Sequence, residues 1–79
     1  MIIKIYTIET CKYCIMAKKL LLNANLQYEE IKLDNDYEKL ENLIELTKQK
    51  QVPQIFIDNQ FIGGYEDLKE FLNKKIYNT

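Results

Sequence analysis

The spacing of apolar side chains changes twice within the first 33 residues, and this pattern restricts the fold more than any other feature of the chain. Residues 2–6 form a short, isoleucine-rich apolar run, which is typical of a buried strand. Residues 12–24 place apolar side chains at helical spacing, and residues 27–33 return to a strand-like alternation. A strand, a helix and a strand within about 30 residues make a βαβ unit. We therefore expect the first two strands to be parallel and joined by a right-handed crossover.

The helix expected at residues 12–24 has a broad apolar surface. Its main stripe comprises Cys14, Ala17, Leu20, Leu21 and Ala24. The apolar side chains that widen this stripe are Ile15, Met16 and Leu22. A stripe of this width predicts a helix that is covered on two sides. Asn23 and Asn25 are candidates for its end.

The middle of the chain predicts a second helix. Residues 34–36 read Asp-Asn-Asp and supply N-cap candidates. The residues that share one face of this helix are Tyr37, Leu40, Leu43, Ile44 and Thr47. Residues 48–51 are polar and are expected to connect this helix to the next strand.

A hairpin and a third helix complete the chain. Pro53 precedes a strand at residues 54–58, a turn at Asn59 and Gln60, and a returning strand at residues 61–63. The last helix is expected from about Tyr65 to Ile76. Its apolar face comprises Leu68, Phe71, Leu72 and Ile76. The order βαβαββα predicts one α/β domain over residues 1–79, with a four-stranded mixed sheet.

Composition excludes several classes of function. Eleven lysines oppose twelve carboxylates, arginine is absent, and the net charge is -1. The chain therefore lacks the basic patch of a nucleic-acid-binding protein. The N-terminal run is too short and too charged for a signal-peptide core, and no apolar stretch approaches the roughly 18 residues of a membrane span. We expect a cytoplasmic protein with no membrane contact, in a compartment where thiols are mostly kept reduced.

The only two cysteines, Cys11 and Cys14, form a C-x-x-C pair that has several structural explanations. A structural zinc site needs four cysteine or histidine ligands, and the chain has no histidine, so no metal is expected. A stabilising disulfide is disfavoured, because closing so short a loop removes little entropy from the unfolded chain. Cys14 alone fits a small buried core residue.

A redox couple fits both the spacing and the position of the pair. Cys11 lies at the expected strand-to-helix turn, where free backbone N–H groups and the helix dipole stabilise a thiolate. Lys12 adds a neighbouring positive charge, so we expect a lowered pKa for the Cys11 thiol and a nucleophilic role for it. Cys14 lies three residues later and is close enough to attack a sulfur bound to Cys11. A C-x-x-C pair beside a βαβ pattern is typical of a thioredoxin-like couple.

Three separated stretches resemble one family, the glutaredoxins. Residues 6–14 (Y-T-I-E-T-C-K-Y-C) resemble the active-site strand and loop of that family, including Tyr13 before the second cysteine. Residues 51–58 (Q-V-P-Q-I-F-I-D) resemble its T-V-P-x-I-F-I segment, and residues 63–68 (G-G-Y-E-D-L) resemble its G-G-x-x-D-L turn. The resemblance covers essentially the whole chain in the right order. It implies a thioredoxin fold with sheet order 2-1-3-4, three flanking helices and a cis peptide before Pro53.

The resemblance also implies a binding site for glutathione as co-substrate. Its cysteine would pair with the Val52 backbone beside Pro53 and Gln51, while Tyr13 flanks the sulfurs. Its γ-glutamyl end would bind the turn formed by Gly64, Tyr65, Glu66 and Asp67. Helix N–H groups there suit a carboxylate and Asp67 suits an ammonium, although Glu66 and Asp67 are also explained as carboxylates that favour the helix dipole.

The chain departs from the family at four of these positions. Ile8 stands where many members carry a lysine that is thought to meet the glycyl carboxylate of glutathione, and Lys48 or Lys50 is a candidate substitute for that charge. Gln51 replaces the usual threonine, Tyr65 replaces a usually smaller residue, and Lys12 replaces a common proline. These differences bear on glutathione affinity more than on the cysteine chemistry.

The predicted activity is that of a dithiol glutaredoxin, a monomer that reduces protein disulfides and glutathionylated proteins. Cys11 attacks the disulfide, and either Cys14 or a second glutathione resolves the mixed disulfide. One alternative is a dedicated electron donor to ribonucleotide reductase. Another is a [2Fe–2S] carrier, ligated in a dimer by two Cys11 thiolates and two glutathiones. Family members that carry such clusters have non-proline residues between the cysteines, so Lys12 keeps this alternative open.

Overall fold

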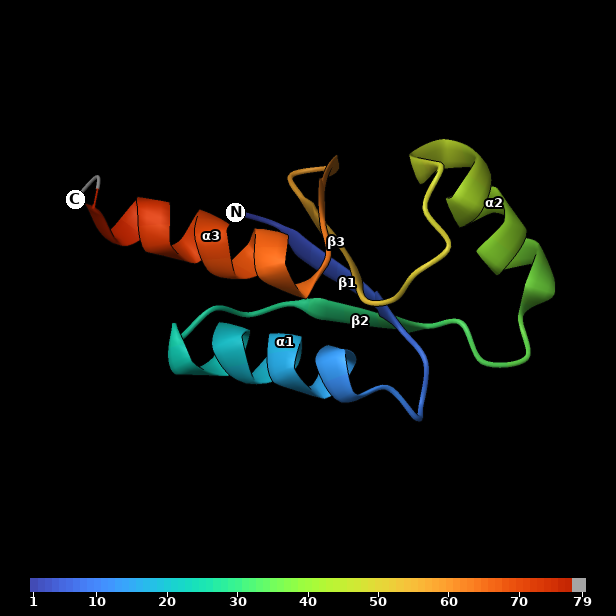
Figure 1. The fold of residues 1–79 in the computed structure, drawn as a ribbon, viewed down its shortest axis with the longest axis horizontal. Coiled ribbons are helices and arrows are strands. Elements are labelled where there is room, and N and C mark those ends of the chain that lie inside the picture. Colours follow the sequence, from blue (N-terminus) through green and yellow to red (C-terminus); the bar gives the residue numbers. More distant parts are fainter. Residues whose placement is uncertain (78–79) are drawn as a thin grey trace.

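The computed structural model describes residues 1–77, and their side chains as far as Lys74. The elements are β1 (Ile3–Thr7), α1 (Lys12–Asn23), β2 (Glu29–Lys32), α2 (Tyr37–Thr47), β3 (Gln54–Ile57), β4 (Gln60–Gly63) and α3 (Tyr65–Tyr77). This order confirms the predicted βαβαββα arrangement, with strand ends that move by one or two residues (Figure 1). No helix in the described part of the chain combines the length and the hydropathy needed to cross a membrane.

The four strands form one mixed sheet in the order β2-β1-β3-β4, as the family resemblance implies. β1 pairs in parallel with β2, and the intervening helix α1 supplies the crossover. β3 pairs antiparallel with both β1 and β4. Thr7 is the last residue of β1, and the loop that carries Cys11 follows it directly.

Each face of the sheet has its own apolar cluster. The first cluster lies under α1 and α3, which run side by side in Figure 1, and comprises Ile3, Ile5, Ala17, Leu21, Ile55, Ile57 and Leu68. The second lies under α2 and comprises Leu33, Leu43 and Phe56, with Tyr6, Leu40, Val52 and Phe61 packed against it. The alternating burial of β1 follows from this arrangement, since successive side chains of a strand point to opposite faces.

Three large side chains assigned to apolar helix faces are exposed, contrary to expectation. α1 packs against the sheet and α3, but two of the side chains expected to widen its covered stripe are exposed, Ile15 by 49% and Leu22 by 62%. On α2, Tyr37 is 77% exposed, although the apolar spacing assigned it to the covered face of the helix. Tyr37 is the first residue of that helix and is not among the residues packed in the cluster that buries Leu43. The expected contribution of Ile76 to the face of α3 falls outside the residues whose side chains are described.

Local capping explains where these elements begin and turn. The carboxylate of Asp36 accepts a hydrogen bond from the backbone N–H of Lys39 at 3.0 Å, which makes Asp36 the N-cap of α2. The hairpin turn falls at Asp58 and Asn59, one residue earlier than expected, with φ values of 50° and 67°. Asp and Asn tolerate this left-handed conformation, and two such residues in succession suit a tight hairpin.

Candidate functional site

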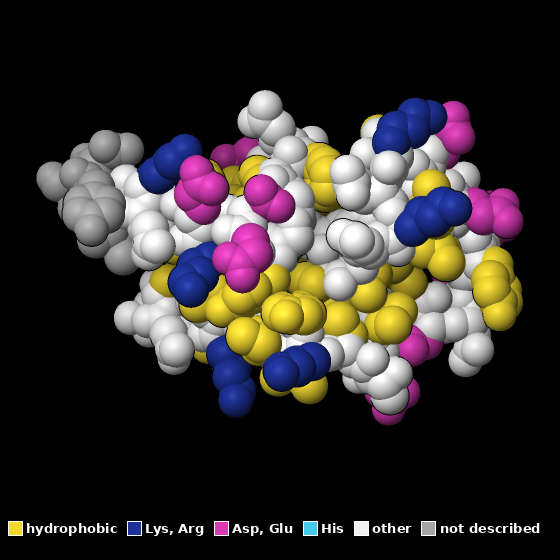
Figure 2. Space-filling view, viewed as in Figure 1, with side chains coloured by type: hydrophobic (Ala, Val, Ile, Leu, Met, Phe, Trp, Pro, Cys, Tyr) yellow, Lys and Arg dark blue, Asp and Glu magenta, His cyan; other side chains and the backbone are white. Residues whose placement is uncertain are grey.

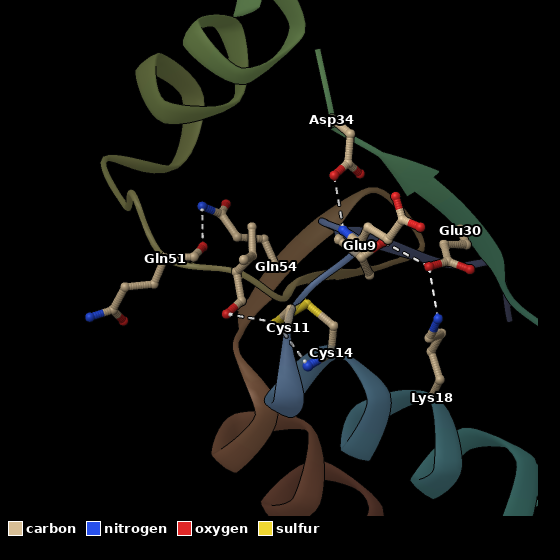
Figure 3. Close-up of a disulfide and its surroundings, with 10 residues drawn as sticks. Glu9, Cys11, Cys14, Lys18, Glu30, Asp34, Gln51 and Gln54 are labelled. Atoms are coloured by element: carbon tan, nitrogen blue, oxygen red, sulfur yellow. Dashed lines mark hydrogen bonds and ion pairs between the residues drawn. A yellow bond between two sulfur atoms is a disulfide. The ribbon is translucent and has the colours of Figure 1, made fainter. Parts of the chain in front are cut away.

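The two cysteines lie at the start of α1 and are joined by a disulfide (Figure 3). Cys11 is the N-cap residue of α1, and the backbone N–H of Cys14 donates a hydrogen bond to its sulfur at 3.1 Å. Cys14 is 1% exposed, whereas Cys11 is only half-buried. The sulfur that solvent and substrates can reach is therefore that of Cys11, and it is also the one that the helix N-terminus faces.

The loop before β3 lies beside the reactive sulfur. The Val52–Pro53 peptide bond is cis, as the resemblance implies. The Val52 carbonyl oxygen lies 3.9 Å from the Cys11 Sγ. Because a disulfide sulfur carries no hydrogen, this distance describes proximity rather than a hydrogen bond. An extended chain bound to Cys11 would therefore lie against the Val52 backbone.

A buried amide holds this loop from the inside. The Gln54 side chain is 2% exposed, and its Nε2 donates to the carbonyl oxygens of Gln49 at 2.8 Å and Gln51 at 3.0 Å. Thr47 supports the same loop, because its hydroxyl accepts from the Gln49 N–H at 3.2 Å. The Oε1 of Gln54 is buried without a hydrogen-bond partner among the described residues. Both amide protons of Gln54 are therefore committed to fixing the loop that presents Val52.

Replacing Gln54 by glutamate should test this clamp. The Gln54→Glu variant loses both donors and places a buried carboxylate against two carbonyl oxygens, which should lower the free energy of unfolding by about 1–3 kcal/mol at pH 7. Burial raises the pKa of such a carboxyl in the folded state. The loss should therefore be smaller at pH 5, where more of the group is protonated, than at pH 8. Urea unfolding at both pH values measures it.

The Gln49→Glu variant is the matched control, because that side chain is exposed while its backbone carbonyl stays in place. We expect it to change stability by no more than about 0.5 kcal/mol. Equal stabilities for Gln54→Glu and Gln49→Glu at both pH values would show that the amide does not hold the loop.

A cavity of about 660 Å³ extends from the Val52 loop to the start of α3. The predicted site residues that line it are Tyr13, Gln51, Val52, Pro53, Gly64, Tyr65, Glu66 and Asp67. The structure thus brings together side chains from α1, the β3 loop and the turn before α3. The lining residues that the sequence analysis missed are Gln49, Gln54, Phe61, Ile62 and Gly63. The one available signal for Gln54 was that it is a polar residue in a strand whose other residues are apolar.

The far end of the cavity is built around Asp67. Its Oδ2 accepts a hydrogen bond from the Gly64 N–H at 3.1 Å, so it caps the first turn of α3. Gly63 has a φ of 124° and packs directly under the Asp67 side chain, which occupies the place of a Cβ. A side chain at this position would thus be strained and would displace Asp67. Glu66 and Asp67 are both exposed and give this end of the cavity a negative charge.

Two tyrosines stand at the wall of the cavity. The rings of Tyr13 and Tyr65 lie 5.8 Å apart between centroids and are tilted by 44°. Tyr13 is 53% exposed, so one ring is available to a bound molecule. Aromatic pairs at this separation and tilt are mutually favourable, so the departure at Tyr65 places a second ring against Tyr13 in the cavity wall.

The candidate cations are not part of the cavity wall. Neither Lys48 nor Lys50 is among the residues that line it. Lys48 forms an ion pair with Glu45 at 3.3 Å, with its side chain 73% exposed. Ile8 is 37% exposed on the loop before Cys11. A role for either lysine in binding a carboxylate stays a prediction.

A partly buried hydrogen-bonding network supports the end of β1. Thr7 is fully buried, and its hydroxyl donates to the Glu30 carboxylate at 2.7 Å. Lys18 of α1 forms an ion pair with the same carboxylate at 2.9 Å. The hydrogen bond from Thr7 lowers the pKa of Glu30, and Lys18 lowers it further against an opposing effect of burial. This network ties β1, β2 and α1 together, and Figure 3 shows Lys18 and Glu30 to one side of the cysteine pair.

In the reduced protein, we expect the pKa of the Cys11 thiol to lie well below the free-cysteine value of about 8.5. The Cys14 N–H that contacts its sulfur, the helix dipole and Lys12 all favour the anion. Thiolate absorbance near 240 nm measured against pH tests this, and a midpoint at or above about 8 would remove the proposed activation. Lys12→Glu should raise the midpoint, whereas Lys19→Glu, two turns further along α1, should change it less.

Comparison with known proteins gives a consistent result. The family model described as Glutaredoxin matches residues 3–62. Glutaredoxin 3 of Escherichia coli K12 is 46% identical over 66 residues, which cover 84% of this chain and 80% of the relative. Glutaredoxin 1 of Rickettsia prowazekii is 50% identical over 66 residues, covering 81% of this chain and 70% of the relative.

Solved structures agree with these sequence relatives. Glutaredoxin 1 from Francisella tularensis, complexed with cacodylate, superposes with a TM-score of 0.81 at 33% identity, covering 99% of this chain and 98% of that one. A buckwheat glutaredoxin in complex with glutathione superposes with a TM-score of 0.84 at 28% identity, covering 92% of this chain and 69% of that one.

Proposed function

This chain belongs to the glutaredoxin family and is a thiol–disulfide oxidoreductase, and we propose that glutathione is the co-substrate that cycles its cysteine pair. The observation that carries the proposal is the cavity that extends from Val52 to the start of α3, because the Val52 carbonyl oxygen lies 3.9 Å from the Cys11 Sγ although Cys11 itself does not line the cavity. A tripeptide linked to Cys11 through its sulfur has its backbone at Val52 and its γ-glutamyl end at the turn. The buckwheat relative, which was solved with glutathione, supports this reading.

The two ends of the cavity suit the two ends of that tripeptide. Val52 offers a backbone for pairing with the cysteine of glutathione, as an added strand would. The first turn of α3 offers backbone N–H groups to the α-carboxylate, and Asp67 offers a carboxylate to the ammonium. Tyr13 flanks the sulfurs from the cavity wall.

The reaction begins with the reduced pair. The Cys11 thiolate attacks one sulfur of a substrate disulfide, which forms a mixed disulfide and releases the other sulfur as a thiolate. The Cys14 thiolate then attacks the Cys11 sulfur and releases the second substrate thiolate. Two glutathione molecules return the pair to the dithiol, supply the two electrons, and leave as glutathione disulfide. A glutathionylated substrate needs only the first attack, in which Cys11 takes up the glutathione and the substrate leaves as a thiolate. A second glutathione then attacks the sulfur of the glutathione bound to Cys11, which releases the Cys11 thiolate and glutathione disulfide.

The decisive experiment is glutathione-coupled reduction of a small mixed disulfide, hydroxyethyl–glutathione disulfide. Turnover is followed by NADPH oxidation with glutathione reductase present. We expect turnover that depends on glutathione and vanishes without it. An enzyme that ignores glutathione but accepts electrons from thioredoxin reductase would contradict the proposal, and would favour the dedicated donor to ribonucleotide reductase. The [2Fe–2S] alternative stays a prediction that an absorbance spectrum after anaerobic reconstitution tests.

A further inference from the structure

The outward face of α1 carries two lysines and two exposed aliphatic side chains in a single row. Lys12, Ile15, Lys19 and Leu22 follow the spacing i, i+3, i+7 and i+10, which places them on one side of a helix. Ile15 and Leu22 are 49% and 62% exposed, and both lysines are exposed. We call these four residues the α1 docking face. Figure 2 shows lysine side chains bordering apolar side chains along this helix.

The charge of α1 is opposite to that of the whole chain. The helix contains three lysines and no carboxylate, whereas the chain has a net charge of -1. Lys18 is engaged by Glu30. Lys12 and Lys19 form no ion pair within the described part of the chain, since the four ion pairs there involve other lysines. The docking face is therefore a positive and apolar surface without an internal partner.

This face begins beside the reactive sulfur and does not overlap the proposed glutathione site. Lys12 follows Cys11 directly, and Leu22 lies ten residues further along the helix, or about 15 Å. None of the four residues lines the cavity. A protein attached to Cys11 through its own cysteine can thus extend along α1 with the cavity left open.

We propose that the α1 docking face binds an acidic amphipathic segment next to the target cysteine of protein substrates. The proposal rests on the proposed function, because it concerns the protein disulfides that the cysteine pair reduces. Lys12 and Lys19 attract carboxylates of that segment, and Ile15 and Leu22 contact its apolar side chains. Exposed charge pairs act mainly on the rate of encounter and on the choice of partner. The expected effect therefore lies in kcat/KM and depends on salt.

Two matched peptides provide the probe. Each has an internal disulfide followed by a ten-residue segment with leucine at helical spacing; one peptide carries glutamate at the remaining positions and the other carries lysine. Single-turnover reduction by pre-reduced protein measures the second-order rate without glutathione. For the unaltered protein at low salt, we expect the acidic peptide to react about three to ten times faster. This preference should fall toward unity near 0.5 M salt, as screening shortens the range of charge attraction.

Two variants outside the cysteine machinery test the face itself. Lys19→Glu should remove or reverse the preference for the acidic peptide, and Leu22→Gln should slow both peptides. Both variants should reduce hydroxyethyl–glutathione disulfide at the unaltered rate. Equal rates for the two peptides at low salt would overturn the proposal, as would a Lys19→Glu variant that keeps the full preference. Failure of the proposed function would appear separately, as loss of glutathione-coupled turnover in the unaltered protein.

Discussion

The Cys14→Ser variant is expected to keep deglutathionylation and to lose reduction of protein disulfides by the dithiol route. Cys11 is the half-buried sulfur at the helix N-terminus, so the variant retains the group that attacks a glutathionylated substrate. A second glutathione from solution can then displace the bound one. A mixed disulfide with a protein has lost its intramolecular attacker, however, and must wait for solution glutathione.

The size of this loss follows from effective molarity. A well-placed intramolecular group can act as if present at about 10⁵ M or more. Glutathione in solution at millimolar concentration cannot replace it, so the protein-disulfide rate should fall by several orders of magnitude. The Cys11→Ser variant is the control and should lose both activities. Equal losses of the two activities in Cys14→Ser would mean that both cysteines are needed for the first attack.

The Asp67→Ala variant is expected to weaken the use of glutathione by roughly 10- to 150-fold in apparent affinity. This corresponds to about 1.5–3 kcal/mol for a hydrogen bond to a charged group, here between Asp67 and the ammonium of glutathione. The pKa of the Cys11 thiol should hardly move, because Asp67 lies at the opposite end of the cavity from the Val52 loop. Glutathione dependence of turnover and thiolate titration measure the two quantities separately.

Asp67 also caps α3, and a matched variant separates the two roles. Asp67→Asn keeps a side-chain oxygen for the Gly64 N–H, which Asp67 contacts at 3.1 Å, but removes the charge. We expect Asp67→Asn to retain the stability of the protein and to lose most of the glutathione affinity. Unchanged glutathione kinetics in Asp67→Asn, with lower stability in Asp67→Ala, would show that Asp67 only caps α3.

Local sequence signals were enough to predict the order of elements and the position of the cysteines. Side-chain periodicity identified the βαβ unit, and capping preferences placed the start of α2 at residues 34–36, of which Asp36 is the N-cap. The position of Cys11 at the start of α1 followed from the same local pattern. These signals work because they depend on residues within one or two turns of each other.

Features that depend on distant residues were not predictable in the same way. Periodicity assigned Ile15 and Leu22 to the stripe of α1, but only the packed sheet and α3 decide which side of that stripe is covered. The network of Thr7, Lys18 and Glu30 joins residues up to 23 positions apart. Gln54 acquires its role from a loop that curls back onto it. Each depends on tertiary structure rather than on spacing along the chain.

In the proposed reaction, Cys11 is the nucleophile that carries glutathione. Mass spectrometry can test it directly, after the Cys14→Ser and Cys11→Ser variants have each been incubated with glutathione disulfide. We predict a glutathione adduct on Cys11 of Cys14→Ser that is removed by added glutathione, and an inactive Cys11→Ser variant. An adduct that forms on Cys14 of Cys11→Ser, with deglutathionylation intact, would contradict this assignment and exchange the roles of the two cysteines.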